Sequence, residues 1–269
     1  MNIKIPKNRS LDYIKKYFKS CKLEELSKKH FDHYKMSVND VFGSKYYPPD
    51  LRLLYRLHQL VILNKRTTIT EMGSGWSTLV FSSALIENKK KYSKEVKKLR
   101  RNNPFELFVL EDIKKYKDFN KKKNSDFLKK NSTKIEVHWL NTKAKMVSYN
   151  GMFATEYNKL PFCSPDFIYL DGPSQFSIKN KINNFSTAHK DIVPIGCDLL
   201  KIEYFLTPGT IVVVDGRAAT AKFLRDNFKR KWVYKKDKNF DQYIFILNDV
   251  SFGKWNNLQL EFYKKGKIS

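Results

Sequence analysis

Apolar residues recur along this chain with two periods, one typical of helices and the other typical of strands. Residues 1–45 are polar overall, with apolar positions every three to four residues: Leu11, Ile14, Phe18, Leu23 and Leu26. This spacing puts them on one face of a helix, so the segment is predicted to form a helical cap. A proline pair and an acid at 47–50 then suit the first turn of a helix, predicted over 50–64.

From residue 67 onward, short β-branched or apolar runs alternate with helical patterns. Strands are predicted at 67–71, 105–110, 134–140, 166–170 and 209–214. Helices are predicted at 77–87, 113–130, 191–206 and 218–227. Such alternation favours right-handed crossovers and a mostly parallel sheet with helices on both faces. Two further runs, at 232–234 and 243–247, lack a long helix between them and predict an antiparallel edge hairpin.

These elements predict an α/β protein with a seven-stranded sheet. The expected organisation is a cap over 1–45, one domain over 46–250 and a C-terminal extension over 251–269. No internal repeat and no linker rich in glycine or proline divides the sequence.

Cysteine usage and hydropathy restrict the cellular setting. No stretch approaches the roughly 20 apolar residues of a membrane span, and the first residues lack the apolar region of a secretory signal. Cys21, Cys163 and Cys197 are widely spaced and form no Cys-x-x-Cys pair, so neither a disulfide framework nor a zinc ribbon is expected. A cytoplasmic location is predicted.

The charge balance is strongly basic. Lysine and arginine number 52 against 27 acids, which gives a net charge of +25. This excess predicts either a polyanionic partner (nucleic acid, acidic polysaccharide or an anionic membrane surface) or a lysine-rich surface without a dedicated partner. The oligomeric state does not follow from the sequence.

A glycine-rich turn after the first predicted strand is the first candidate for chemistry. It reads Glu71-Met72-Gly73-Ser74-Gly75, and glycines there let the backbone approach a ligand closely. A Walker A loop is excluded because no Gly-Lys-Ser/Thr follows. Thr78 stands where a dinucleotide fingerprint needs a third small residue, which disfavours an NAD-dependent enzyme.

Acids follow three of the later strands. Glu111 ends the second strand, where a carboxylate can accept hydrogen bonds from a ribose diol. Asp171 and Asp215 end two strands that we expect to be neighbours, so their carboxylates should meet at one cleft mouth. Asp171 is a candidate general base, both aspartates are candidates for a metal site, and Arg217 is expected to pair with Asp215.

This ordered series resembles the class I S-adenosylmethionine (SAM) methyltransferase superfamily over roughly residues 50–250. The resemblance implies a Rossmann-like fold and SAM as cofactor. It implies that Glu71, Gly73, Ser74 and Gly75 surround the methionine part and that Glu111 binds the ribose. It further places Asn141 near the adenine, although no acid stands there, and puts Asp171 beside the cofactor.

The acids Asp171 and Asp215 also resemble the pattern of catechol-type O-methyltransferases, which hold Mg²⁺ with an acid after strand four and an Asp-Asn pair after strand five. Gly216 replaces that asparagine here. The resemblance implies Mg²⁺ or Mn²⁺ at these two aspartates. The Asp-Gly turns are also similar to those of methyltransferase-like proteins from bacterial surface-polysaccharide clusters.

Methyl transfer needs an aligned acceptor and a group that takes its proton, and Asp171 and His189 are the candidate bases. We predict O-methylation of a small-molecule or carbohydrate hydroxyl. The alternatives are a non-catalytic module that binds an anionic polymer and an RNA methyltransferase. Acceptor specificity is expected in the cap and in 141–165 and 172–200, predicted as loops and short helices.

Overall fold

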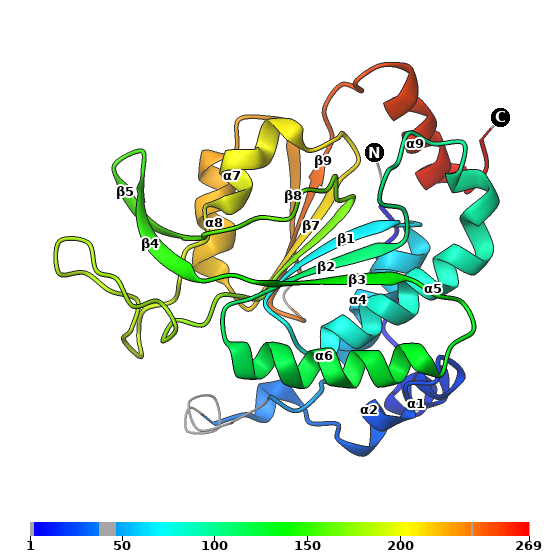
Figure 1. Cartoon of the computed structure of the whole chain (residues 1–269), viewed down its shortest axis with the longest axis horizontal. Coiled ribbons are helices and arrows are strands. Elements are labelled where there is room, and N and C mark those ends of the chain that lie inside the picture. Colours follow the sequence, from blue (N-terminus) through cyan, green and yellow to red (C-terminus); the bar gives the residue numbers. More distant parts are fainter. Residues whose placement is uncertain (1–2, 38–46, 238, 269) are drawn as a thin grey trace.

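The fold is taken from a computed structural model, which describes residues 3–37, 47–237 and 239–268 (Figure 1). The predicted boundary between cap and domain, at residues 45 and 46, lies outside these described residues.

A seven-stranded sheet forms the centre of the molecule, in the order β3-β2-β1-β6-β7-β9-β8. β1 pairs in parallel with both β2 and β6, so the strand order reverses beside β1. β9 runs antiparallel to β7 and to β8, which confirms the predicted edge hairpin and the α/β fold class. The bounds are β1 (Thr68–Met72), β2 (Glu106–Glu111), β3 (Glu136–Asn141), β6 (Phe167–Leu170), β7 (Ile211–Asp215), β8 (Trp232–Asp237) and β9 (Gln242–Leu247).

Helices cover both faces of the sheet because alternate strand residues supply two separate apolar clusters. One cluster joins Leu107 and Val109 to α4 (Leu51–Leu63) and α5 (Trp76–Val96), with α6 (Lys114–Lys129) beside them. The other joins Leu110 and neighbouring strand residues to α7 (Asp198–Ile202) and α8 (Ala218–Asn227).

Two N-terminal helices, α1 (Leu11–Ser20) and α2 (Glu24–Lys28), share the first of these clusters, and the 3-10 turn η1 (His33–Lys35) follows them. The apolar positions read from the sequence are buried there: Ile14, Phe18, Leu23 and Leu26. The cap therefore packs against α4 as part of one continuous core.

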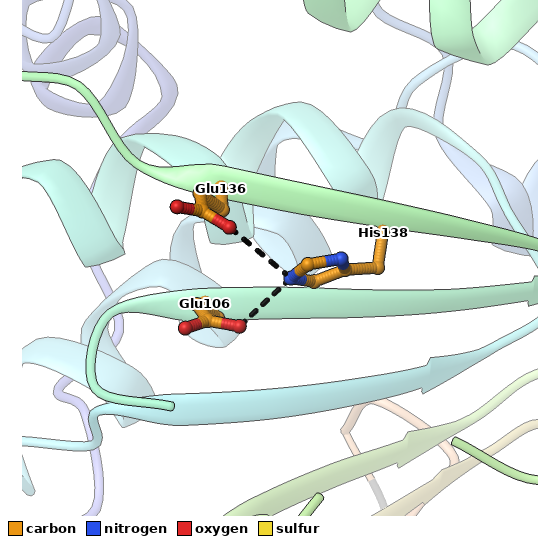
Figure 2. A group of neighbouring side chains, drawn as sticks. All are labelled: Glu106, Glu136 and His138. Carbon is orange, nitrogen blue, oxygen red and sulfur yellow. Dashed lines mark hydrogen bonds and ion pairs between the residues drawn. The ribbon is translucent and has the colours of Figure 1, made fainter. Parts of the chain in front are cut away.

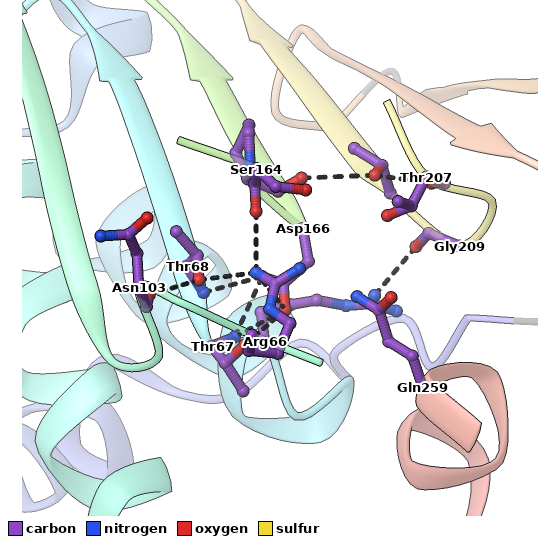
Figure 3. Close-up of polar contacts among 12 residues, drawn as sticks. Arg66, Thr67, Thr68, Asn103, Ser164, Asp166, Thr207, Gly209 and Gln259 are labelled. Atoms are coloured by element: carbon purple, nitrogen blue, oxygen red, sulfur yellow. Dashed lines mark hydrogen bonds and ion pairs between the residues drawn. The ribbon is translucent and has the colours of Figure 1, made fainter. Parts of the chain in front are cut away.

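The C-terminal segment is also part of that core. It contains a helix that the sequence pattern did not predict, α9 (Lys254–Lys265), and Phe262 and Tyr263 are buried. Arg66, fully buried, donates to the Gly209 carbonyl at 2.8 Å and lies 3.9 Å from the Tyr263 ring centroid. Figure 3 shows the polar network around Arg66 and Asp166, which ties α9 to the amino ends of the central strands.

Two predictions about the connecting segments are wrong. Residues 144–157 were expected to be loops and short helices, but they form a hairpin of β4 (Ala144–Tyr149) and β5 (Met152–Tyr157) that projects beyond the sheet (Figure 1). Its turn is Asn150-Gly151, with φ of 48° and 79°, the conformation that a two-residue hairpin turn requires.

The helix predicted over 191–206 is confined to α7 and the 3-10 turn η2 (Glu203–Phe205). The preceding stretch contains Pro194 and Gly196 and pairs with β5 instead. Thr155 donates its backbone N–H to the Ile195 carbonyl, and Cys197 donates its own to the Thr155 carbonyl. Proline and glycine disfavour a helix there, and the partner strand supplies the hydrogen bonds.

No helix among the described residues is long and apolar enough to span a bilayer.

Candidate functional site

A cavity of about 930 Å³ lies beyond the carboxyl ends of β1, β2, β6 and β7. The strand order reverses there, which is where open α/β sheets bind ligands. On one side it is lined by the glycine-rich loop, residues 111–113 and one face of α6. Opposite are residues of the N-terminal segment, α4 and the turn between β8 and β9. Its volume is near the upper end of the range for small-molecule sites.

The glycine-rich loop contacts the loop after β6 backbone to backbone. Gly73 has a φ of +95°, and a Cβ there would lie 2.8 Å from the backbone nitrogen of Gly172. A Cβ on Gly172 would in turn lie 2.9 Å from the Gly73 Cα. Neither loop tolerates a side chain at this crossing, so both glycines are needed to close the floor of the cavity.

Glu71 lies beneath this loop and does not line the cavity. It is fully buried, and its two carboxylate oxygens accept from the Ser77 and Thr78 hydroxyls at 2.5 and 2.7 Å. Burial raises the pKa of Glu71 to about 8, against the opposing effect of these hydrogen bonds. The side chain therefore fastens the loop to the start of α5.

Glu111 holds the outer part of the same loop. Its Oε2 accepts from the backbone N–H and the hydroxyl of Ser74, at 2.9 and 2.6 Å. Its Oε1 accepts from the Ile113 N–H at 2.9 Å, and Asn120 donates to the Ser74 hydroxyl at 3.0 Å. Burial raises the pKa of Glu111 to about 7. Because Oε1 has one protein donor and Glu111 lines the cavity, this oxygen has a lone pair for a ligand hydroxyl.

Asp171 and Asp215 line the middle of the cavity. No described residue donates a hydrogen bond to the Asp171 carboxylate, whose residue is exposed to the cavity but lies among the protein atoms that line it. Desolvation by these atoms raises the pKa of Asp171, while Arg217 and His33 oppose the rise. Asp215 accepts from the Tyr169 hydroxyl at 2.6 Å, and burial followed by the charge of Asp171 raises its pKa to about 7.

Arg217 does not form the predicted ion pair with Asp215. Its Nη2 donates instead to the backbone carbonyl of Asp171 at 2.5 Å. Arg217 follows Gly216, whose φ of +60° turns the chain at the end of β7. The guanidinium thus lies beside the end of β6.

A metal at Asp171 and Asp215 fits the residues poorly. Within the described part of the chain, the three-membered group of metal-ligand side chains lies elsewhere, at Glu106, Glu136 and His138 (Figure 2). Mg²⁺ prefers six oxygen ligands. Asp171 and Asp215 supply only two carboxylates, and that of Asp215 already accepts a hydrogen bond from Tyr169.

The structure does not bring His189 or Asn141 to the cavity. The His189 side chain is 61% exposed in the long connection after β6, with its Nδ1 3.9 Å from Asp191. Asn141 pairs with Glu111 in the sheet but is exposed at the end of the edge strand β3, outside the cavity lining.

His33 lines the cavity instead, and its charge acts on Asp171. Its Nε2 donates to the Pro48 carbonyl at 2.7 Å, so Nδ1 is the ring nitrogen that remains for a proton or a ligand. The sequence did not indicate that His33 lines the cavity, because the N-terminal segment reaches the cavity only through tertiary packing.

Aromatic and amide side chains on α6 are a second group that the sequence analysis overlooked. Tyr116, Asn120 and Lys123 line the cavity, and their i, i+4, i+7 spacing places them on one helical face. The Lys123 Nζ lies 3.2 Å from the ring centroid of Trp76, which also lines the cavity and donates its indole N–H to the Tyr47 carbonyl. The helical spacing was visible in the sequence, but the lysine-rich composition obscured it.

No protein-family model and no curated protein matches this chain. Among solved structures, an O-methyltransferase from Bacillus cereus in complex with SAH is similar at 13% identity and a TM-score of 0.39, covering 88% of this chain and 96% of its own. The O-methyltransferase TomG from Streptomyces achromogenes, involved in tomaymycin synthesis and in complex with SAM, is similar at 14% identity and a TM-score of 0.39, with the same coverages. These likenesses are distant.

Proposed function

We propose that this protein is a SAM-dependent methyltransferase that methylates a hydroxyl of a small molecule or carbohydrate. The observation that carries the proposal is the closed contact between Gly73 and Gly172, with Glu111 facing the cavity beside it. Together they provide exposed loop backbone and a carboxylate at the point of strand reversal.

In this proposal the cofactor occupies the side of the cavity formed by the glycine-rich loop. Gly73, Ser74 and Gly75 lie against the methionine part, and the Glu111 Oε1 accepts from a ribose hydroxyl. Glu71 supports the loop from below rather than touching the ligand. Ile113 and Tyr116 line the cavity beyond Glu111 and take the adenine role first expected of Asn141.

When bound, SAM would supply a methyl group whose carbon the acceptor oxygen attacks in line, so that a C–O bond forms as the C–S bond breaks and S-adenosylhomocysteine leaves. The acceptor enters from the side formed by residues 6–9, α4 and 239–241, where the cavity continues past Asp171. Asp171 accepts the hydroxyl proton, because its carboxylate has no hydrogen-bond donor among the described residues and desolvation raises its pKa above the usual range, which makes it a stronger base. His33 is the second candidate base, in place of His189. No metal is part of this proposal.

A polyanionic acceptor, RNA included, is the second candidate. Lys115, Lys121 and Lys122 are exposed on α6, the helix that also contributes Tyr116 and Asn120 to the cavity. This acceptor predicts affinity for a 20-nucleotide RNA that falls steeply with salt and with charge reversal of these lysines. An equal loss of RNA affinity on charge reversal of Lys254, Lys264 and Lys265 of α9 would indicate non-specific electrostatic attraction.

The test of the cofactor is calorimetric titration of the full chain with SAM and S-adenosylhomocysteine, with NAD as the negative control. Micromolar binding of the first two, and none of NAD, is expected. No binding at millimolar concentration would overturn the proposal and favour a non-catalytic module for an anionic polymer.

A further inference from the structure

Three side chains gather on one face of β2 and β3, toward the amino ends of these strands and away from the cavity. The parallel register pairs Glu106 with Glu136 and Phe108 with His138. Residues paired across strands, and residues two apart along a strand, point to the same face of a sheet. Glu106, Glu136 and His138 therefore converge, and Figure 2 shows both carboxylates directed at one imidazole nitrogen.

The distances suit ligands of one ion. The His138 Nε2 lies 2.7 Å from the Glu106 Oε2 and 3.7 Å from the Glu136 Oε2. One ligand atom from each residue lies within 4.8 Å of the others. Zinc binds imidazole nitrogen and carboxylate oxygen at about 2.0–2.2 Å, so two ligands of one zinc ion stand roughly 3–3.5 Å apart. Small side-chain rotations bring the group to that spacing.

The inner two ligands are held in place by neighbours. The His138 ring stacks on Phe108, with centroids 4.4 Å apart and planes inclined by 16°. Asn103 donates to the Glu106 Oε2 at 3.0 Å. Such supporting contacts orient ligand side chains in metal sites. The outer ligand, Glu136, is 75% exposed, so an ion can reach the site from solvent.

Facing carboxylates also repel each other in the ion-free state. Glu106 and Glu136 are direct cross-strand partners, and like charges in that arrangement destabilise a sheet. A divalent cation removes this repulsion and joins the edge strand β3 to β2.

We propose that Glu106, Glu136 and His138 bind a divalent transition-metal ion, zinc being the probe of choice, with water in the remaining positions. An imidazole with two carboxylates suits zinc better than magnesium, which prefers oxygen ligands alone. The ion stabilises the β2–β3 edge and takes no part in chemistry at the opposite end of the strands. The site is thus independent of the proposed methyltransferase function.

Calorimetric titration of the chelator-treated full chain with zinc chloride at pH 7.5 tests the site. One equivalent is expected to bind, and His138→Gln and Glu136→Gln should each weaken binding by roughly tenfold or more. His189→Gln is the matched control, since it removes an exposed histidine next to a single carboxylate. Because ligand nitrogen must be unprotonated, wild-type affinity should fall at pH 5.5.

Two results would overturn the site: no zinc binding by the wild type, or equal binding by the wild type and both ligand variants. The latter would show that the zinc binds at other side chains, which both variants retain. S-adenosylhomocysteine affinity, measured on the same proteins, should be unchanged in every variant. If the wild type did not bind S-adenosylhomocysteine, the proposed methyltransferase function would fail, and the zinc result would still stand.

Discussion

Asp166 and Asp171 flank the same strand, β6, but differ in burial and in hydrogen-bond partners. Asp166, at the amino end, is fully buried and accepts from the backbone N–H groups of Thr67 and Thr68 and from the Tyr263 hydroxyl. Its Oδ2 lies 3.7 Å from the Arg101 guanidinium. Asp171, at the carboxyl end, lines the cavity without a donor to its carboxylate among the described residues.

The difference separates structural from functional acids in this fold. A buried carboxylate with its hydrogen bonds made stabilises the structure, and removing it leaves several donors unpaired. A carboxylate without such donors contributes little to stability but is available to a ligand or a proton. In a parallel sheet the two kinds fall at opposite ends, because ligands bind beyond the carboxyl ends of the strands.

The largest expected effect is at the structural end. Asp166→Ala should lower the free energy of unfolding by about 3–5 kcal/mol, because it leaves the buried donors of Thr67, Thr68 and Tyr263 without their acceptor and removes the carboxylate beside Arg101. Urea denaturation measures this. Asp171→Ala is the matched variant and should change the free energy of unfolding by less than about 1 kcal/mol. Similar losses of unfolding free energy in the two variants would show that both aspartates contribute alike to stability.

The next effect is on cofactor binding. Glu111→Ala should weaken binding of S-adenosylhomocysteine by about 1–3 kcal/mol, the scale of a lost hydrogen bond to a charged group. Calorimetry gives the affinity. Glu106→Ala, at the other end of β2, serves as the control and should bind the cofactor as the wild type does. Unchanged affinity in Glu111→Ala would remove the ribose assignment.

A smaller effect is expected on the pH dependence of stability, through Glu71 at the carboxyl end of β1. The pKa of Glu71 is about 8 in the folded protein against an ordinary value of 4.5, so between these values the folded state keeps a proton that the unfolded state releases. Stability therefore falls as pH rises toward 8, by up to about 1.4 kcal/mol per pH unit for this group.

Melting temperatures at pH 6.5 and 8 measure this slope, since about 1 kcal/mol corresponds to roughly 2–4 °C in a chain of this size. Glu71→Gln has no such proton to lose and should show a flatter profile. Glu111 and Asp215, each with a pKa of about 7, maintain part of the slope in that variant. An identical slope in both proteins would contradict the assignment to Glu71.

The smallest effect concerns the oxygen-ligand metal expected from the sequence. Mg²⁺ should leave the melting temperatures of the wild type and of Asp215→Asn unchanged, and any rise that Mn²⁺ causes through Glu106, Glu136 and His138 should be the same in both proteins. A rise in the wild type alone would restore a metal at Asp171 and Asp215.

Local patterns allowed most of the fold to be predicted. β1, β2, β6 and β7 lie within one or two residues of the predicted strands, because each is a short apolar or β-branched run. The β4–β5 hairpin could also have been predicted, since Asn150-Gly151 stands between two runs of alternating polarity.

Other elements depended on distant partners. The stretch before α7 pairs with β5, about 40 residues earlier, so its apolar residues do not form a helix. In α9, the place of Tyr263 depends on Arg66 and Asp166, which lie much earlier in the sequence and meet it only in the folded chain.

The sequence by itself determined the sheet, the glycine-rich loop and the presence of acids at the strand ends, because periodicity and turn chemistry are local properties. Only the tertiary structure decided the role of each acid. Glu71 and Glu111 were both identified from the same series of strand-end motifs. Packing nevertheless buries Glu71 under the loop, whereas Glu111 lines the cavity. The same packing brings His33 to Asp171 and leaves His189 in solvent, since side-chain surroundings depend on segments that meet only in the folded chain.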